Sequence, residues 1–131
     1  MPRSDFLLPL SREHHSALVL ARAARKALDT NDQLACLEVL EKIETYWHAV
    51  MAVHFDKEEQ LLQQASIMLH SDDVARIHFE HEQLRILADK SCSLDLPVRL
   101  GKFADLMAAH VRYEERVLFP LLERCFDKFL K

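Results

Sequence analysis

Residues 54–62 read His-Phe-Asp-Lys-Glu-Glu-Gln-Leu-Leu, and residues 110–118 read His-Val-Arg-Tyr-Glu-Glu-Arg-Val-Leu. In both stretches a histidine precedes a pair of glutamates by four positions, and two aliphatic residues follow the pair. A shorter motif, Glu-His, also occurs twice, at residues 13–14 and 80–81. Because the two motifs alternate along the chain, the sequence looks like two copies of one helical hairpin.

These polar residues lie on otherwise apolar stripes. The apolar side chains around them recur at alternating steps of three and four, which places them on one face of an α-helix. Polar residues on such a face are expected to point into the protein interior. The predicted stripes comprise Leu7, Leu10, His14, Ala17, Ala21, Ala24 and Leu28; Leu37, Leu40, Glu44, Trp47, Met51, His54, Glu58, Leu61 and Ala65; Val74, Ile77, His81, Leu84 and Ala88; and Leu100, Phe103, Met107, His110, Glu114, Val117 and Leu121.

Ser, Asp, Asn and Pro residues interrupt the helical pattern at residues 29–32, 66–73 and 91–97, which predicts four helices. Short connections make consecutive helices antiparallel, so the predicted fold is all-α, an up-down-up-down antiparallel four-helix bundle. We expect residues 1–131 to form this one domain. The expected helix-start residues are Ser11, Asn31 or Asp32, Ser71 or Asp72, and Pro97, and Pro120 is expected to end or kink the last helix.

The composition narrows the functional classes. The chain has 131 residues, 17 basic and 21 acidic side chains, a net charge of −4 and one glycine. So few turn residues argue against a β-sandwich or barrel, and the lack of a basic run argues against nucleic-acid or membrane partners. The longest apolar runs fall far short of the roughly 20 residues that span a bilayer. With three scattered, reduced cysteines and no secretory leader, we expect a cytoplasmic protein.

The spacing of His and Glu indicates a metal site. Two residues four apart lie about 40° from each other on one helix face and about 6 Å apart along the axis, so both can reach one metal centre. This selects Glu58 and Glu114, whereas Glu59 and Glu115 are expected to lean away. The candidate ligands are therefore His14, His54, Glu58, His81, His110 and Glu114.

A bound cation would stabilise the two buried carboxylates, each of which would otherwise cost several kcal/mol as an unpaired charge. Four imidazoles and two carboxylates exceed the needs of a tetrahedral zinc site. They suit octahedral iron or manganese, as a pair of ions bridged by both carboxylates.

The predicted levels of these residues along the bundle agree across the connection near residue 68. Across the connection near residue 94 they differ, at about 13 and 18 residues, by an amount that loop and tilt can absorb, and the first hairpin fits worst. His14 lies about 17 residues before the first connection, whereas the His54/Glu58 pair is centred about 25 residues after it, a mismatch of about 12 Å along a straight helix. An uneven loop or a tilted first helix is expected to absorb this difference.

The ordered set His, His-x-x-x-Glu, His, His-x-x-x-Glu, with its Glu-Glu-x-Leu-Leu and Glu-Glu-x-Val-Leu-Phe-Pro flanks, is similar to the hemerythrin-like (HHE) cation-binding domain family. The resemblance covers about residues 7–122. It implies a non-haem di-iron centre in which Glu58 and Glu114 bridge the ions and the histidines are terminal ligands. Family roles include reversible oxygen binding, oxygen or redox sensing, iron handling and repair of damaged iron–sulfur centres.

Two positions depart from the oxygen-carrying members of that family. Ile77 stands four residues before His81, where the carriers have a second histidine, and the last helix has Glu114 after a shorter gap instead of an aspartate. The chain resembles the broader bacterial group, including the repair proteins, more closely. The cysteine-bearing N-terminal domain of those repair proteins is not expected here.

The leading expectation is a di-iron protein that binds or senses O2 or a related small oxidant, NO or peroxide. A redox or peroxidase-like enzyme, iron delivery to damaged clusters, and an interaction module stabilised by metal are the alternatives, with a metal-free bundle as the simplest one. Whether the protein is an enzyme stays open, and manganese is an alternative metal.

Several further residues have an expected place. His78 is expected to act as a seventh ligand or as a partner of a ligand, His15 to lie at the rim, and Glu44 to face the bundle end or pair with a basic residue. Tyr113 and, less so, Tyr46 are candidates to donate to a metal-bound oxygen species. His48 and His70 are expected in solvent, and Trp47, Phe55, Phe79, Phe103 and Phe119 in the core.

Overall fold

The computed structural model describes residues 3–130, so residues 1, 2 and 131 of the predicted domain lie outside the described part. Every regular element in that part is helical, as predicted, and no strand occurs in it. None of its helices is both long and apolar enough to cross a membrane. The elements are α1 (Leu8–Thr30), α2 (Gln33–Tyr46), η1 (Trp47–Met51), α3 (Ala52–Gln64), α4 (Ser71–Ala88), α5 (Leu96–Tyr113), η2 (Glu114–Leu118) and α6 (Phe119–Leu130).

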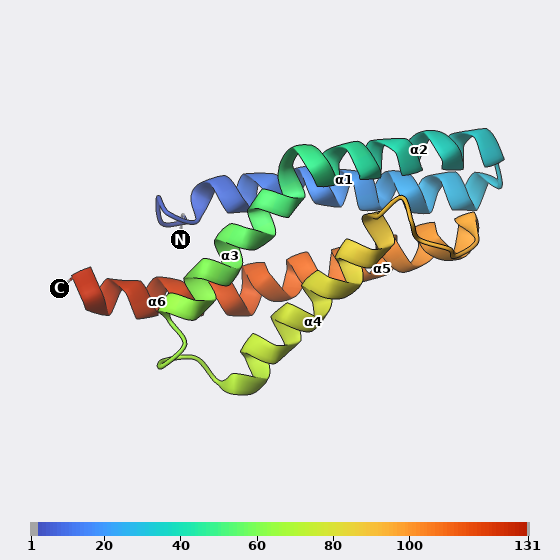
Figure 1. Cartoon of the computed structure of the whole chain (residues 1–131). Coiled ribbons are helices and arrows are strands. Elements are labelled where there is room, and N and C mark those ends of the chain that lie inside the picture. Colours follow the sequence, from blue (N-terminus) through green and yellow to red (C-terminus); the bar gives the residue numbers. More distant parts are fainter. Residues whose placement is uncertain (1–2, 131) are drawn as a thin grey trace.

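The segments η1 and η2 are single π-helical turns that join α-helices without a break. Residues 3–130 therefore form four helical rods: α1, α2–η1–α3, α4, and α5–η2–α6 (Figure 1). Pro120 is the second residue of α6 and follows the π turn η2 closely, so this residue does not end the helix.

The rods pack as a helical bundle. Helix α1 contacts α5 and α2, and α4 contacts α5 and α3. At η1 the second rod bends, so that α3 leaves the direction of α2 and crosses towards α6 (Figure 1). A π turn is a known cause of such a bend because it interrupts the regular i to i−4 hydrogen bonds. The bend accounts for the level mismatch in the first hairpin, since the second rod is not parallel to α1 throughout.

Helix starts agree with the sequence only in part. Asp32 caps α2 by accepting hydrogen bonds from the N–H groups of Leu34 and Ala35, as predicted. Helix α1 begins at Leu8 and not after Ser11, because a proline in its first turn needs no hydrogen-bond partner for its nitrogen. The cap of α4 is the imidazole of His70, one residue before the predicted position.

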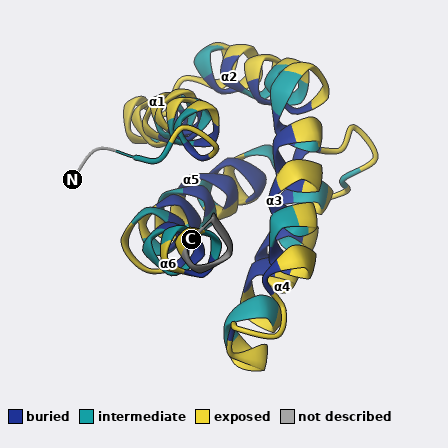
Figure 2. Ribbon diagram, turned by 90° about the vertical axis from the view of Figure 1, so that its left-hand side faces the viewer, coloured by how far each residue is buried: buried dark blue, intermediate teal, exposed yellow. Residues whose placement is uncertain are grey.

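The apolar core is divided into two clusters. One includes Ala17, Met51, Leu84 and Met107, and the other includes Leu10, Leu62, Ile77 and Leu118. In each rod the candidate ligands lie along the chain between a member of the first cluster and a member of the second. Buried residues face the interior of the molecule in all rods (Figure 2). The polar residues are thus enclosed by apolar packing on both sides.

The predicted apolar stripes are wrong before η1 and from η2 onwards. Leu37 and Val117 are exposed, whereas their neighbours Cys36 and Leu118 are buried. Each π turn adds one residue to the helical repeat, which moves the buried face by one position on its far side. Phe79, predicted as core, is 64% exposed on α4.

Candidate metal centre

The six predicted ligands meet at one place in the interior. They come from all four rods, and each is at most 1% exposed. Their ligand atoms form two groups of four, within 4.8 Å of one another in each group, and both glutamates belong to both groups. We refer to these six residues as the central cluster. The first group is His14, His54, Glu58 and Glu114, and the second is Glu58, His81, His110 and Glu114.

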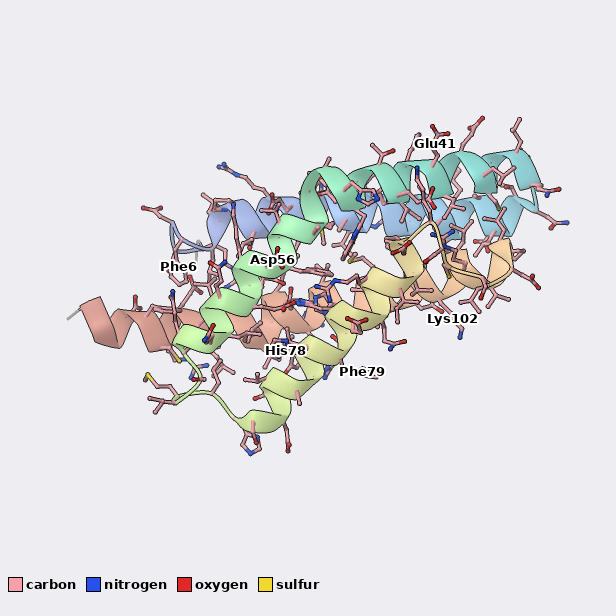
Figure 3. All side chains as sticks on the ribbon, in the orientation of Figure 1. Phe6, Glu41, Asp56, His78, Phe79 and Lys102 are labelled. Atoms are coloured by element: carbon pink, nitrogen blue, oxygen red, sulfur yellow. The ribbon has the colours of Figure 1, made fainter. Side chains whose placement is uncertain are left out.

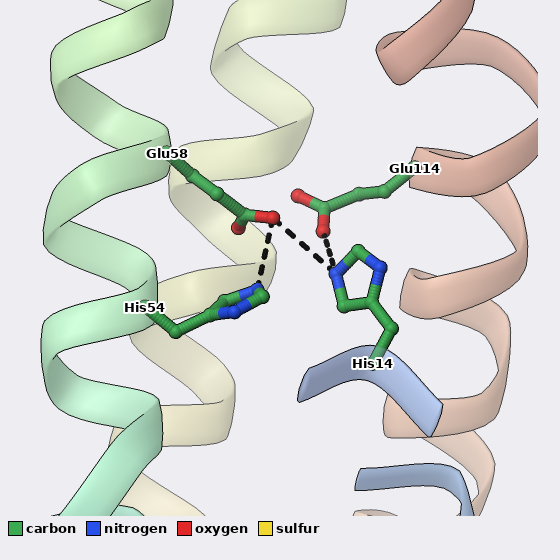
Figure 4. Close-up of side chains that lie close together, drawn as sticks. All are labelled: His14, His54, Glu58 and Glu114. Carbon is green, nitrogen blue, oxygen red and sulfur yellow. Dashed lines mark hydrogen bonds and ion pairs between the residues drawn. The ribbon is translucent and has the colours of Figure 1, made fainter. Parts of the chain in front are cut away.

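In the first group the imidazoles face the two carboxylates through their Nε2 atoms (Figure 4). Glu58 Oε2 lies 3.0 Å from His54 Nε2 and 3.3 Å from His14 Nε2. Glu114 Oε1 lies 2.8 Å from His14 Nε2. Three helical segments, α1, α3 and η2, thus direct two nitrogens and two oxygens at one point.

The second group uses the remaining oxygens of the same glutamates. Glu58 Oε1 lies 3.0 Å from His81 Nε2. Glu114 Oε2 lies 3.2 Å from His110 Nε2 and 3.5 Å from His81 Nε2. Each carboxylate therefore turns one oxygen towards each pair of histidines, which is the arrangement that a bridge between two ions requires.

Several of these buried atoms lack a hydrogen bond of good geometry. They are both oxygens of Glu58, Oε2 of Glu114, and Nε2 of His54, His81 and His110. An unsatisfied buried polar group costs about 1–3 kcal/mol, and more if charged, so native interiors contain few of them. Six in one place, all nitrogen and carboxylate oxygen, are a donor set that fits a pair of iron or manganese ions.

The other ring nitrogen of each histidine contacts a second glutamate. These four glutamates, which we call the outer glutamates, surround the central cluster without belonging to it. The Nδ1-to-oxygen distances are 2.5 Å for His14–Glu115, 3.0 Å for His54–Glu13, 2.8 Å for His81–Glu59 and 2.8 Å for His110–Glu80.

A carboxylate beside Nδ1 fixes the tautomer of the imidazole when the ring is neutral. The neutral ring then donates its Nδ1–H to the carboxylate, and its Nε2 lone pair can bind a metal. Such carboxylate–histidine pairs hold the ring in place and make it a better ligand. The four outer glutamates therefore prepare all four imidazoles for coordination.

The outer glutamates are the functional residues that the sequence analysis missed. Each is the immediate neighbour of a central residue, as in Glu13-His14 and Glu58-Glu59. Adjacent helical residues differ by about 100° in direction, so one of the two points to the centre and the other reaches a neighbouring rod. Glu59 and Glu115 do lean away from the centre, as predicted, and contact ligands of other helices. The sequence signal that could have revealed the outer glutamates is the repetition of these adjacent pairs, Glu-His and Glu-Glu, each of which occurs in both halves of the chain.

The central carboxylates favour protonation of His14, His81 and His110 when no metal is bound. Burial lowers the pKa of His14, but hydrogen bonds to Glu114, Glu115 and Glu58 outweigh it and raise the pKa to about 12. The same balance of burial against Glu58 and Glu114 raises the pKa of His81 to about 10, and with Glu80 that of His110 to about 9. Despite burial, the facing histidines hold the pKa of Glu114 well below its usual value.

Aromatic rings close the space around the central cluster. Phe55 stacks on His81 with ring centroids 3.9 Å apart and planes 4° apart. Phe119 stacks on His14 with centroids 5.1 Å apart. Both phenylalanines are fully buried, as predicted, and they limit the access of water to the imidazoles.

The remaining predicted histidines lie outside the central cluster. His15, His48 and His70 are exposed, as expected for solvated or rim residues. His78 belongs to neither group of four, is half-exposed, and has its Nδ1 3.8 Å from Glu59 Oε1. It is thus near an outer glutamate and not at the centre.

Three other polar residues have partners away from the centre. The Tyr113 hydroxyl donates to Asp73 at 2.6 Å, and the Tyr46 hydroxyl donates to the carbonyl of Glu13 at 3.0 Å. Glu44 accepts a hydrogen bond from the buried Arg99 at 3.2 Å, which confirms the expected basic partner.

Comparison with family models, with curated proteins and with solved structures finds no match to this chain. The motif and the geometry of the central cluster are therefore the basis on which a function is proposed.

Proposed function

We propose that this protein is a hemerythrin-like, non-haem di-iron protein with an up-down-up-down four-helix fold, and that it binds or senses O2 or a related small oxidant. The observation that carries the proposal is the pair of two-histidine groups that share both carboxylates of Glu58 and Glu114. Zinc sites of four ligands have no need of a second such group, whereas a carboxylate-bridged pair of ions uses all six residues.

The donor count leaves room for an external molecule. Each group offers two nitrogens and two oxygens, which is four ligands. Iron and manganese prefer about six ligands, so roughly two positions per ion stay available. When bound, the iron pair would supply the electrons that O2 or peroxide chemistry needs.

Residues around the central cluster determine which kind of external molecule the site favours. Phe55 and Phe119 cover imidazole faces with apolar surface, which favours a small molecule of low polarity over bulk water. The hydroxyls of Tyr46 and Tyr113 donate to groups outside the centre, so neither is available as a donor in this arrangement. The outer glutamates keep Nε2 of each histidine directed inwards.

The decisive experiment is to load the protein with iron, measure iron per chain, and record the visible spectrum without oxygen, after adding air, and after removing it. We expect about two irons per chain and an oxygen-dependent absorption band. A reversible band supports a carrier or sensor, and irreversible oxidation supports redox or repair chemistry. A stabilising metal with no response to O2, NO or peroxide would leave only an interaction module, and absence of metal would refute the proposal.

A further inference from the structure

A polar cavity of about 520 Å3 lies beside the central cluster, between α3 and α4. Asp56 on α3 and His78 on α4, both labelled in Figure 3, belong to its wall. So does the outer glutamate Glu59. The other polar residues of the wall are Gln60, Gln63 and Ser66. Two carboxylates, an imidazole and neutral oxygen donors are therefore exposed together at this surface.

Glu59 connects this cavity to the central cluster. Its Oε1 lies 3.8 Å from Nδ1 of His78 on the outside, and its Oε2 lies 2.8 Å from Nδ1 of His81 on the inside. Nε2 of His81 is in turn 3.0 Å from Glu58 Oε1. A single imidazole thus separates the cavity wall from the central carboxylates.

Two of the other outer glutamates are covered by cations. Arg3 contacts Glu115 at 3.2 Å, and Arg76 contacts Glu80 at 3.1 Å. A positive group in front of a carboxylate repels an approaching metal ion. Glu59 also has an arginine nearby, but Arg85 lies 3.7 Å from Oε2, the oxygen on the His81 side and not the one that faces His78, and its shorter contact is with Glu82 at 2.9 Å.

Four other cavities in the described part of the chain lack this connection. The apolar groove between α1 and α2 and the cavities at Phe6, at Phe79 and at Leu28 include none of the outer glutamates. The cavity at Phe6 also contains Lys57, which disfavours a cation. The cavity at Glu59 therefore combines acidic character with contact to a residue that touches a central histidine.

We propose that this cavity captures a hydrated divalent cation, Fe2+ or Mn2+, and passes it through Glu59 and His81 to the central cluster. Asp56 and His78 are the capturing residues, because carboxylate and imidazole are ligands that both ions accept. Glu59 is the relay, since it has one oxygen on each side. This proposal rests on the proposed metal-binding function and adds the route by which the metal arrives.

The test compares the rate of Fe2+ uptake, without oxygen, by the metal-free wild-type protein and by the double variant His78→Ala/Asp56→Asn. Free Fe2+ is followed with a colorimetric chelator after rapid mixing. Acidic clefts raise the association rates of cations about tenfold or more at low ionic strength. We therefore expect uptake by the variant to be at least about fivefold slower, with an unchanged final iron content and a difference that shrinks as salt is added.

The matched control is His48→Ala/Asp29→Asn, which removes the same two residue types at exposed positions outside the cavity. It should take up Fe2+ at the wild-type rate. An equal rate in the cavity variant and the wild type would overturn the capture site and leave the metal centre standing. Failure of the wild type itself to retain Fe2+ would instead overturn the proposed function. Circular dichroism of each metal-free variant checks that the fold is kept.

Discussion

The two shared glutamates are the residues on which both halves of the centre depend. Substituting Glu58→Ala removes one oxygen from each group of four, and we expect bound iron to fall from about two per chain to a small fraction of one. His110→Ala removes one nitrogen from one group and should chiefly deplete that half. Elemental analysis after gel filtration measures both, with the exposed Glu82→Ala as control. Iron contents equal to wild type in both variants would contradict the assignment.

The outer glutamates should affect affinity without removing a ligand. In Glu80→Gln, Nδ1 of His110 loses a charged acceptor at 2.8 Å. Loss of such partners typically costs 10–100-fold in metal affinity, and we expect a decrease in this range. Competition with a chelator measures it, and Glu82→Gln on the same helix serves as control. An affinity unchanged by Glu80→Gln would show that the hydrogen bond does not tune the ligand.

The histidine pKa values predict opposite pH trends for the metal-free protein and for metal binding. The folded pKa values of His81 and His110, about 10 and 9, lie above the unfolded value of 6.5. Their stabilising contribution is therefore complete below about pH 6.5 and is lost as the pH rises through 9 to 10. Metal affinity should rise over the same range, because bound protons compete with the ion.

Urea unfolding of the metal-free protein and chelator competition, both between pH 6.5 and 10, measure these trends. A midpoint of unfolding that is constant or rises with pH would contradict the predicted protonation of the histidines.

The six residues of the central cluster could be predicted from the sequence, but the outer glutamates around them could not. His14, His54 and the other four residues were identified because a polar side chain on an apolar stripe is costly to bury without a partner, and the pattern recurs in both halves of the chain. Glu13 and Glu80 were missed because one helix alone does not show which neighbouring rod its side face meets. Only the packing of the four rods brings these glutamates to Nδ1 of a histidine on another helix.

Among the elements, the π turns limited what could be predicted. The stripe of α4 needed no correction of position, and that of α1 needed one only at its end, where Ala27 is buried and Leu28 is partly buried. Regular α-helix matches alternating steps of three and four. In the second rod Val39, Ile43, Trp47 and Met51 are all buried at successive steps of four. Three successive spacings of four residues are longer than the 3.6 residues of an α-helical turn. This excess indicates the extra residue in η1.

Inserting one alanine after Ala49 tests this interpretation. Ala49 is exposed and lies within η1, which already accommodates one extra residue, so a second extra residue should rotate α2 by about 100° relative to α3. Buried side chains of α2, such as Val39 and Ile43, would then leave the core, and we expect a loss of roughly 3 kcal/mol or more in unfolding free energy.

Thermal and urea unfolding measure the loss, and Ala49→Ser, which keeps the residue count, is the control. An insertion variant as stable as Ala49→Ser would show that the number of residues in η1 does not set the packing.

For the molecule as a whole, the two apolar clusters on either side of the centre predict how it responds to loss of metal. Each cluster contains residues from all four rods, so the helices stay packed at both ends. The protonated histidines also replace part of the positive charge of the ions. We expect chelation to lower the melting temperature while the far-UV circular dichroism at room temperature stays near that of the loaded protein. Unfolding on chelation would show instead that the metal holds the bundle together.

The oxygens of Glu58 and Glu114, one turned to each side, also bear on how the proposed centre would fill. The first ion would hold both carboxylates in place, so the second ion would lose less entropy on binding. Its affinity would be raised by that coupling, and by linkage it would strengthen the first ion equally. When iron is scarce, the population would then consist mainly of empty and doubly filled molecules. The protein would respond to iron supply as a threshold and not in proportion to it.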